Sequence, residues 1–263
     1  MQISGSTVLL TGATGGIGHA IARELHARGA ELILTGRRTE ILEPLAAELG
    51  ARALAIDLSD SSEVERLAVE AGEIDILVAN AALPASGRLE TYTQEQIDRA
   101  LDVNLRAPIL LAHALLGAMV ARGRGHLLFV SSLQGKAATP GASVYCASKF
   151  GIRGFALGLR ADLHGSGVGV STVFPGFIRD AGMFADSEVK LPPGVGTRAP
   201  EDVARAVVRA IKRNRAEVDI APLPLRAGAI FASLAPELAA NVSRRLGSED
   251  IAHAVGATQQ NKR

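Results

Sequence analysis

Tyr145 and Lys149 have side chains that can move a proton, and they stand four residues apart in the segment VYCASK. On a helix, two such residues share one face and lie about one turn from each other. A lysine ammonium beside a phenol favours the phenolate, which predicts a phenol pKa lowered from about 10 toward working pH. Such a phenol is suited to giving a proton to a carbonyl oxygen. A Tyr-x-x-x-Lys pair on its own is a weak signal, and a partly exposed helix pair that does no chemistry is the more common explanation of it.

A second candidate site is the glycine-rich stretch TGATGGIG, Thr11–Gly18, which directly follows the apolar residues Val8–Leu10. Glycine is costly inside a helix or strand, so this density of glycine predicts that another group approaches the backbone closely. Between a parallel strand and a helix, backbone N–H groups and the helix dipole bind phosphate. The spacing G-x-x-x-G-x-G differs from the common G-x-G-x-x-G dinucleotide fingerprint. The alternative is a turn that uses glycine only for packing between helix and strand.

Short apolar runs alternate with segments of helical period along the chain. The predicted strands are residues 7–11, 31–35, 53–56, 74–79, 126–131, 169–174 and 217–221. The predicted helices are residues 17–28, 40–49, 61–71, 94–120, 144–164 and 200–213. Continuously apolar strands that alternate with helices predict an α/β fold, a Rossmann-like doubly wound parallel sheet of about seven strands with helices on both faces. Such a sheet binds ligands at the carboxyl ends of its strands. The glycine-rich stretch lies at the carboxyl end of the first predicted strand.

Composition predicts one soluble domain over residues 1–263, because the chain is 48% hydrophobic and carries a net charge of +1. The scattered basic residues offer no footprint for nucleic acid or an anionic membrane. The single cysteine, Cys146, excludes an internal disulfide, which favours the cytoplasm. The N-terminus lacks the pattern of a signal peptide, and the apolar stretch 107–121 is too short to span a bilayer. The histidines show no close metal-ligand spacing, so we expect no catalytic metal.

Several separated motifs, in their order and spacing, resemble the short-chain dehydrogenase/reductase superfamily, in its classical subfamily, over about the first 215 residues. Thr11–Gly18 resembles the TGxxxGxG cofactor turn of that family, and Asp57-Leu58 resembles the pair that meets the adenine ring. Ala79-Asn80-Ala81-Ala82 resembles the NNAG segment, with alanine at its first and last positions. Ser132 stands thirteen residues before Tyr145, which is the serine-to-tyrosine spacing of the family.

The resemblance implies a catalytic set of Asn104, Ser132, Tyr145 and Lys149. By this resemblance, Tyr145 would donate a proton to the carbonyl oxygen and Ser132 would hydrogen-bond the developing oxyanion. Lys149 would hold the nicotinamide ribose, and Asn104 would support a water that relays protons. Each of the four also has a purely structural alternative. The cofactor-binding residues that the resemblance implies are Gly12, Thr14, Gly15, Gly16, Ile17, Gly18, Arg37, Arg38, Asp57, Leu58, Asn80, Ala81, Tyr145, Lys149, Pro175, Gly176 and Ile178.

The end of the second predicted strand, LILTGRR, indicates the choice of cofactor. An NAD enzyme places an acidic residue there for the ribose 2′-hydroxyl, whereas a 2′-phosphate needs positive charge. Gly36 occupies that position and is followed by Arg37 and Arg38. A planar guanidinium suits a phosphate, so NADP(H) is favoured over NAD(H).

The chain departs from the family pattern in two places. Asp180 stands where many relatives have a threonine that bonds the nicotinamide amide, and an ionised carboxylate cannot donate that bond. From Pro222 onward an apolar extension, about residues 222–263, replaces the usual short tail. It could roof a site for a hydrophobic substrate together with a lid at about 177–198. The interpretation we favour is that it packs on the body or on another subunit.

The sequence therefore predicts an NADPH-dependent oxidoreductase that reduces a ketone or aldehyde, or runs the reverse reaction, on a small and possibly acyl or other hydrophobic substrate. Family resemblance further implies a homodimer or homotetramer, built on the apolar 107–121 helix and the helix of Tyr145. The alternative from another class is a catalytically idle NADP(H)-sensing binding protein. The intact catalytic set argues against that alternative.

Overall fold

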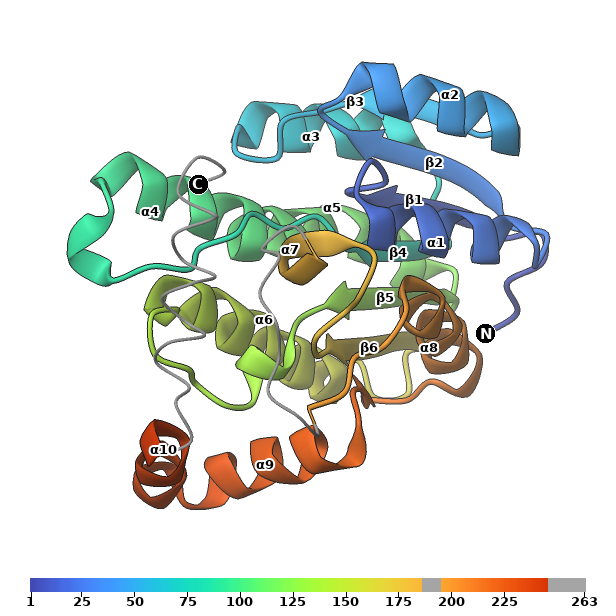
Figure 1. Ribbon diagram of the computed structural model, residues 1–263. Coiled ribbons are helices and arrows are strands. Elements are labelled where there is room, and N and C mark those ends of the chain that lie inside the picture. The colour runs from blue at the N-terminus through green and yellow to red at the C-terminus, as the bar shows by residue number, and fades with distance from the viewer. Residues whose placement is uncertain (186–194, 246–263) are drawn as a thin grey trace.

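The computed structural model describes residues 1–185 and 195–245, and in them a seven-stranded parallel sheet carries helices on both faces (Figure 1). The strand order is β3-β2-β1-β4-β5-β6-β7, and every neighbouring pair is parallel. The strands are β1 (Thr7–Thr11), β2 (Glu31–Gly36), β3 (Arg52–Ala55), β4 (Ile76–Ala79), β5 (Gly125–Val130), β6 (Val168–Pro175) and β7 (Glu217–Ile220). The order reverses between β1 and β4, which is the switch point where such sheets bind ligands.

The helices connect these strands. They are α1 (Gly16–His26), α2 (Thr39–Leu49), α3 (Ser61–Ala71), α4 (Gln94–Leu101), α5 (Ala107–Ala121), α6 (Ser143–Asp162), α7 (Gly182–Ala185), α8 (Pro200–Arg213), α9 (Leu223–Leu234) and α10 (Pro236–Arg245). Short 3₁₀ turns lie at Leu89–Thr91 and Leu133–Gly135, and a π-helical turn lies at Asp102–Arg106.

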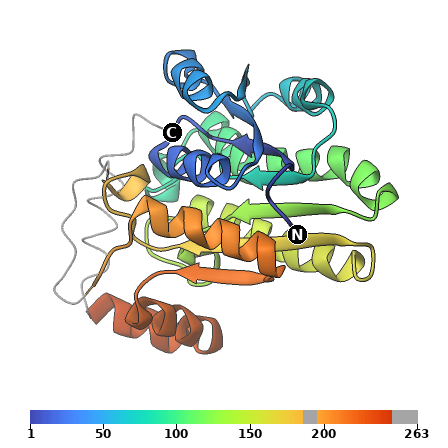
Figure 2. The ribbon, with the colours of Figure 1, turned by 90° about the vertical axis from the view of Figure 1, so that its right-hand side faces the viewer.

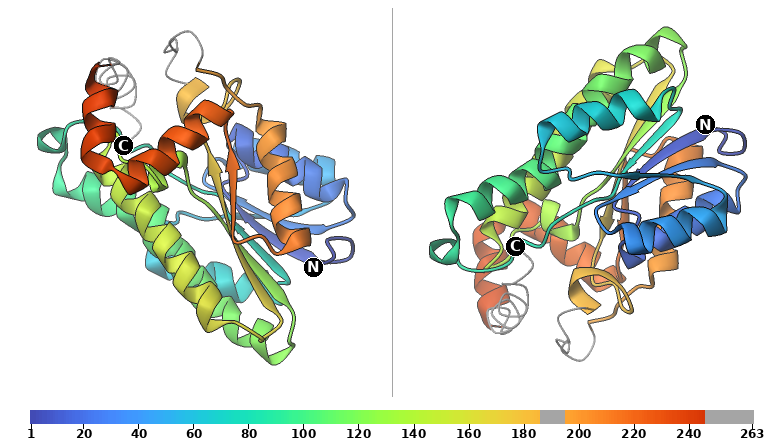
Figure 3. Two further views of the ribbon diagram at one scale, coloured as in Figure 1. Left: turned by 90° about the horizontal axis from the view of Figure 1, so that it is seen from below. Right: turned by 90° about the horizontal axis from the view of Figure 1, so that it is seen from above.

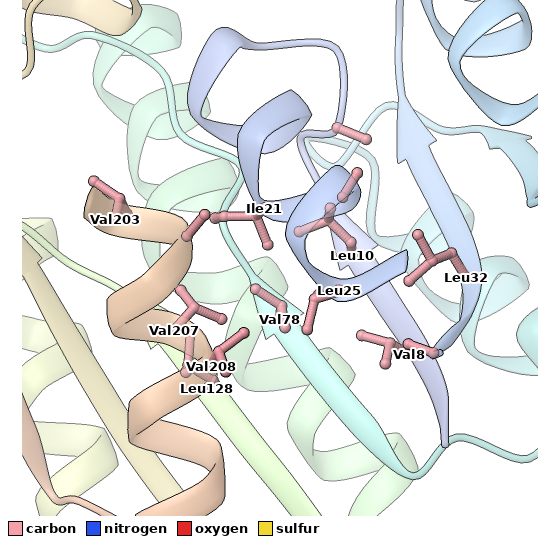
Figure 4. Close-up of a cluster of buried hydrophobic side chains, with 14 of the residues drawn as sticks. Val8, Leu10, Ile21, Leu25, Leu32, Val78, Leu128, Val203, Val207 and Val208 are labelled. Carbon is pink, nitrogen blue, oxygen red and sulfur yellow. The ribbon is translucent and has the colours of Figure 1, made fainter. Parts of the chain in front are cut away.

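Two apolar clusters bury the two faces of the sheet. On one face α1, α2 and α8 pack against the strands, and Figure 4 shows α1 and α8 meeting there. Leu10 and Val78 of the sheet lie beside Ile21 of α1 and Val207 of α8, all fully buried. On the other face α3, α5 and α6 cover the sheet, as the view along its edge shows (Figure 3). Strands buried on both faces explain why their sequences read as continuous apolar runs.

Local signals in the sequence determine where the helices begin and end. Asp60 caps α3, because its carboxylate accepts from the Ser62 N–H at 2.8 Å. α8 begins with Pro200 at its first position and ends at Asn214 in the left-handed conformation (φ 44°). The predicted bounds of these two helices, 61–71 and 200–213, and of the first strand, 7–11, match the observed ones. Apart from the helix 94–120, the other predicted strands and helices differ from the observed ones by one or two residues at their ends.

The predicted helix 94–120 is wrong as one regular helix, because the π-helical turn divides it into α4 and α5. The apolar stretch 107–121, expected to be too short to span a bilayer, belongs to a longer helical run. In the residues described, Gln94–Ala121 is one helical run whose apolar window has a mean hydropathy of 1.5, long enough to cross a membrane by length and composition. That window is 44% buried inside the protein, and a core helix passes the same test, so the run is weak evidence of a membrane span.

The extension after Pro222 forms α9 and α10 as far as the structure describes it, to residue 245. Both helices lie beyond β7 at the side of the molecule opposite α2 and α3 (Figures 1 and 2). Much of their apolar surface is exposed; the large side chains more than two fifths exposed are Leu223, Ile230, Phe231, Leu234, Leu238 and Val242. α9 therefore contacts the body, as favoured, without burying most of its apolar side chains. The predicted extension beyond residue 245 lies outside the described residues.

Candidate active site

The residues predicted to do chemistry follow the carboxyl ends of adjacent strands. The glycine turn, Thr11–Gly18, follows β1, Asn80 follows β4 and Ser132 follows β5. These strands are neighbours and parallel, so their carboxyl ends bring the three segments to one edge of the sheet. α6 adds Tyr145 and Lys149 to the same edge.

Tyr145 lies beside both Ser132 and Lys149. The Ser132 hydroxyl hydrogen-bonds the Tyr145 phenol, and the Lys149 ammonium nitrogen lies 5.5 Å from the centroid of the phenol ring. Lys149 Nζ donates to the Val130 carbonyl oxygen at 3.1 Å, and the Gln134 N–H donates to Ser132 Oγ at 3.2 Å. Tyr145 is 9% exposed and Lys149 only 2%. The backbone around β5 therefore holds both the hydroxyl and the ammonium beside a buried phenol.

Burial controls the protonation of this pair. It raises the pKa of Tyr145 to about 12, although the hydrogen bond from Ser132 opposes the rise. It lowers the pKa of Lys149 to about 8. The prediction that Lys149 brings the phenol pKa down toward working pH is therefore wrong for the chain alone, because taking the phenolate out of water outweighs its neighbours. At neutral pH the phenol carries its proton, which is the form that a proton donor needs.

Asn104 lies in the π-helical turn between α4 and α5 and is 2% exposed. Its side chain bonds within the chain, because Oδ1 accepts from the Leu83 N–H at 2.7 Å and Nδ2 donates to the Leu83 carbonyl oxygen at 2.9 Å. The Asn104 carbonyl cannot accept the usual helical bond from four residues on, because Pro108 has no N–H. The side chain of Asn104 is therefore occupied by Leu83, and its part in a water relay stays a prediction.

Packing inside the chain requires glycine at two positions of the glycine turn. Gly12 has a φ of +69°, and a Cβ there would lie 2.7 Å from the Ala81 Cα. A Cβ on Gly18 would lie 2.2 Å from the Gly12 carbonyl oxygen. The packing role that we kept as an alternative is thus real for both glycines, and it does not by itself indicate a ligand.

The N-terminus of α1 does have the features of a phosphate site. Its N-cap residue is Gly15, which has no side chain to cap the helix, and its first turn contains no acidic residue. Among the described residues, the nearest atom to a Cβ on Gly15 would be the Gly12 oxygen at 3.7 Å, an ordinary van der Waals contact, so nothing in the chain crowds this position. Uncapped N–H groups at the positive end of a helix dipole bind phosphate. The turn therefore fits the pyrophosphate of a dinucleotide.

Asn80 and Ala81 hold the glycine turn in place. Asn80 Nδ2 donates to the carbonyl oxygens of Thr11 and Gly12, both at 3.1 Å. Thr11 Oγ1 accepts from the backbone N–H groups of Asn80 at 3.0 Å and Ala81 at 3.1 Å. The structure thus gives both residues a role in shaping the turn, while their predicted contact with the cofactor stays a prediction. Ile17, which lies between Gly16 and Gly18 of the glycine turn, packs against the apolar cluster formed by α1, α2 and α8 on the sheet.

Asp57 lies after β3, at the predicted adenine end of the site. Its Oδ1 accepts from the Ser59 N–H at 3.0 Å and the Ser59 hydroxyl at 2.8 Å. Its Oδ2 lies 3.9 Å from Arg37 Nη1 and 3.7 Å from Arg99 Nη2. Burial opposes ionisation, but the Ser59 hydrogen bonds and the two guanidiniums outweigh it and lower the pKa of Asp57. Asp57 is therefore an ionised acceptor, which suits an adenine amino group, and the buried Leu58 lies next to it.

The end of β2 carries positive charge. A Cβ on Gly36 would lie 2.7 Å from Thr14 Cγ2 and 3.0 Å from Thr14 Oγ1, so Thr14 occupies the space that an acidic side chain would need. Arg38 Nη2 donates to the Thr14 carbonyl oxygen at 2.6 Å, which places this guanidinium beside the glycine turn. The Arg37 side chain is 48% exposed. Two guanidiniums thus stand where the ribose 2′ substituent is predicted to bind, and one of them, Arg37, also faces the Asp57 carboxylate at 3.9 Å.

β6 ends at Pro175, and the segment that follows it from Gly176 is fixed to the sheet. The Gly176 N–H donates to the Ile220 carbonyl oxygen at 3.0 Å. Ile178 is 3% exposed and pairs with Arg198 in an isolated parallel bridge. Both ends of the predicted lid, 177–198, are therefore joined at its base, while its residues 186–194 lie outside the described part.

The first part of the lid reaches across the site. A Cβ on Gly16 would lie 2.4 Å from the Ala181 Cβ, so Ala181 rests against the N-terminus of α1. Met183 packs against the small apolar cluster around Tyr145. Asp180, the residue that replaces the usual threonine, has a φ of 64°, is 73% exposed and pairs with Arg179 at 3.3 Å. Its carboxylate thus has a partner within the lid.

A family model described as short chain dehydrogenase matches residues 6–191, which include the glycine turn and the catalytic set. The chain belongs to the short-chain dehydrogenase family. It is 35% identical to the ketoacyl reductase HetN of Nostoc sp. over 232 residues, which cover 85% of this chain and 81% of that protein. It is 34% identical to the 3-oxoacyl-[acyl-carrier-protein] reductase FabG of Rickettsia conorii over 216 residues, 79% of this chain and 89% of that one.

Solved structures agree with this membership. A short-chain dehydrogenase from Sphingobium yanoikuyae in complex with NADPH superposes with a TM-score of 0.77 at 28% identity, covering 89% of this chain and 95% of that one. The predicted family and the Rossmann-like α/β fold are confirmed, and this short-chain dehydrogenase is an NAD(P)-dependent oxidoreductase. The roles of single site residues stay predictions.

Two site residues escaped the sequence analysis. Pro108 has no N–H to donate to the Asn104 carbonyl four residues before it. This spacing could have predicted an irregular helix at Asn104. Arg99 contacts Asp57, but no local pattern links these residues, which come from different crossovers. Within the described residues, no group of three or more histidine, cysteine or acidic side chains is arranged to hold a metal ion.

Proposed function

We propose that this protein reduces a ketone or aldehyde to an alcohol with NADPH, or catalyses the reverse oxidation. The observation that carries the proposal is that Ser132 and Lys149 both lie beside the Tyr145 phenol, at the sheet edge that also holds the uncapped N-terminus of α1. A protonated, buried phenol beside a hydroxyl is suited to receive a carbonyl oxygen between them.

The bound cofactor would supply the hydride that adds to the carbonyl carbon. Tyr145 holds the proton at its Oη and gives it to the carbonyl oxygen. Ser132 donates a hydrogen bond to the same oxygen as negative charge develops, and one such donor is typically worth about 10²–10³ in rate. Lys149 binds the ribose and places a positive charge beside the phenol as it loses its proton. Burial of Tyr145 and Lys149 keeps water away from this transfer.

NADPH is the proposed cofactor because of the charge at the end of β2. Arg37 and Arg38 supply guanidiniums there, and Thr14 fills the space of an acidic residue at position 36. A 2′-phosphate would meet two guanidiniums at this point, one of which, Arg37, lies 3.9 Å from the Asp57 carboxylate. The solved relative in complex with NADPH is in keeping with this choice.

A hydrophobic, acyl-type carbonyl compound is the proposed substrate class. Tyr145 belongs to a small apolar cluster; its other members are Ala85, Ile97, Ala100, Ala142, Val144, Cys146 and Met183. The rings of Phe177 and Phe184 contact each other in the lid at a tilt of 57°, with centroids 4.9 Å apart. Two of the most similar relatives are described as reductases of ketoacyl groups, which supports the same class.

A homo-oligomer that acts in the cytoplasm is the proposed state of the protein. Apolar side chains on the outer faces of α5 and α6 favour subunit contact, since Val120, Phe150 and Leu157 are each about two fifths exposed.

A carbonyl panel assayed with NADPH and with NADH tests the proposal. We expect NADPH oxidation with long-chain ketones or 3-oxoacyl compounds, faster than with NADH. Binding of NADPH without turnover on any carbonyl would instead support the idle sensing protein. Rapid turnover of small polar carbonyls alone would refute the hydrophobic substrate class.

A further inference from the structure

Lys136 is a largely enclosed lysine that the proposed reaction does not use. It stands four residues after Ser132, and its side chain is 10% exposed. Its ammonium nitrogen lies 2.7 Å from Asp219 Oδ1 and 2.9 Å from Glu217 Oε2, both on β7. The same nitrogen lies 4.1 Å from the centroid of the Phe174 ring on β6. Two carboxylates and an aromatic face therefore hold this ammonium in one place.

Glu217 joins Lys136 to α6. Arg153 lies one turn after Lys149 on that helix, and its Nε donates to Glu217 Oε1 at 2.7 Å. Burial opposes ionisation of Glu217, but hydrogen bonds from Arg153 and Lys136 outweigh it and lower its pKa. One ionised carboxylate therefore ties the segment that follows Ser132 to the helix that carries the phenol.

α9 contacts the same segment. Ser233 Oγ donates to the Lys136 carbonyl oxygen at 2.8 Å, and Arg226 Nε lies 3.8 Å from Asp219 Oδ2. Ala229 is the buried residue of this helix, whose large apolar side chains stay mostly exposed. The polar contacts of Ser233 with Lys136 and of Arg226 with Asp219 therefore help to hold α9 against the body.

We propose that Lys136 is a positioning residue for the reduction, and that α9 completes its anchorage through Ser233. Ser132 must reach both the phenol and the substrate oxygen, so its reach depends on where the segment 132–136 is held. Lys136 fixes the far end of that segment to β7 and, through Glu217, to α6. This inference rests on the proposed function for the role of Ser132.

Lys136→Met separates this role from simple loss of folding. In that variant Arg153 still pairs with Glu217 and Arg226 still faces Asp219, so each carboxylate keeps a cation. We expect kcat to fall about tenfold and the KM for NADPH to stay within about twofold, because misplacement by a fraction of an ångström costs chemistry and not cofactor binding. The primary isotope effect with 4-deuterated NADPH should rise. Lys136→Arg should recover most of kcat, because it keeps the cation.

Ser233→Ala tests the contribution of α9. It removes one hydrogen bond to Lys136 and should lower kcat about two- to threefold in the same pattern. The matched control is Lys212→Met, which removes an exposed lysine in the last turn of α8 and should change nothing. An unchanged kcat and isotope effect in Lys136→Met would overturn the positioning role. An effect of Lys136→Met with none of Ser233→Ala would overturn the part given to α9.

Amide hydrogen exchange gives a readout that needs no turnover. We expect faster exchange over residues 132–142 in Lys136→Met and, to a smaller degree, in Ser233→Ala, with the rest of the sheet unchanged. If the wild-type protein reduces no carbonyl, the proposed function fails, while this measurement still decides whether Lys136 anchors the segment. Unaltered exchange at 132–142 in both variants would overturn the anchorage.

Discussion

Gly36→Asp should reverse the cofactor preference, because position 36 combines a steric and an electrostatic requirement. The new Cβ would lie 2.7 Å from Thr14 Cγ2, so Thr14 must move, while Arg38 holds its carbonyl at 2.6 Å. Two like charges about 5 Å apart repel by about 3 kcal/mol at an effective dielectric constant of about 20, which is about 100-fold in affinity. Salt screening at this exposed edge reduces the effect, so we expect at least a tenfold loss of NADPH affinity.

NADH affinity should rise or stay the same in Gly36→Asp, since the new carboxylate can accept from a ribose 2′-hydroxyl. The assay is the fluorescence of the reduced nicotinamide on titration with protein, at low and high salt; the chain has no tryptophan that would interfere. Gly228→Asp is the control, because it adds the same charge on α9, where a Cβ has open space among the described residues. Equal loss of NADPH and NADH binding, or no loss of either, would refute the reasoning about charge.

Three further outcomes follow from the structure. Gly18→Ala should abolish NADPH binding and lower the melting temperature, because its Cβ would lie 2.2 Å from a backbone oxygen that cannot yield; full binding in that variant would contradict this. Ser132→Ala should reduce kcat by about 10²–10³ with an unchanged Kd for NADPH, measured in steady state and by titration. Burial lowers the pKa of His126 to about 3, so the unfolded chain takes up this proton first and stability falls as pH drops from about 6.5 toward about 3, by up to about 1.4 kcal/mol per pH unit. Urea unfolding at pH 7 and pH 5 should show a smaller loss in His126→Gln than in the wild type, and equal losses would exclude His126 as the cause.

The sequence was sufficient to predict the succession of strands and helices along the chain up to β7. Apolar runs such as 7–11 and capped helices such as 61–71 carry their own signals, so pattern and periodicity locate them. The π-helical turn at Asn104 was missed because the periodicity of an apolar helix continues through it. It depends on the missing N–H of one proline and on the bond between Asn104 and the distant Leu83.

Motif spacing predicted which residues come to the site but not their electrostatics. Tyr145 and Lys149 share a helix face as expected, yet their pKa values depend on burial by segments far away in the sequence. The contact of α9 with Lys136 was likewise unpredictable, because it joins residues 97 positions apart through a single hydroxyl. Chemistry that depends on tertiary burial cannot be read from spacing alone.

Tyr145→Phe tests the central claim most directly. The substitution removes one hydroxyl from a buried ring, so the fold and NADPH binding should remain. In single-turnover experiments with saturating NADPH and the best carbonyl of the panel, we expect the rate constant of hydride transfer to fall by a factor of about 10²–10⁴. Hydride transfer at the wild-type rate in a folded, NADPH-binding Tyr145→Phe protein would contradict the account.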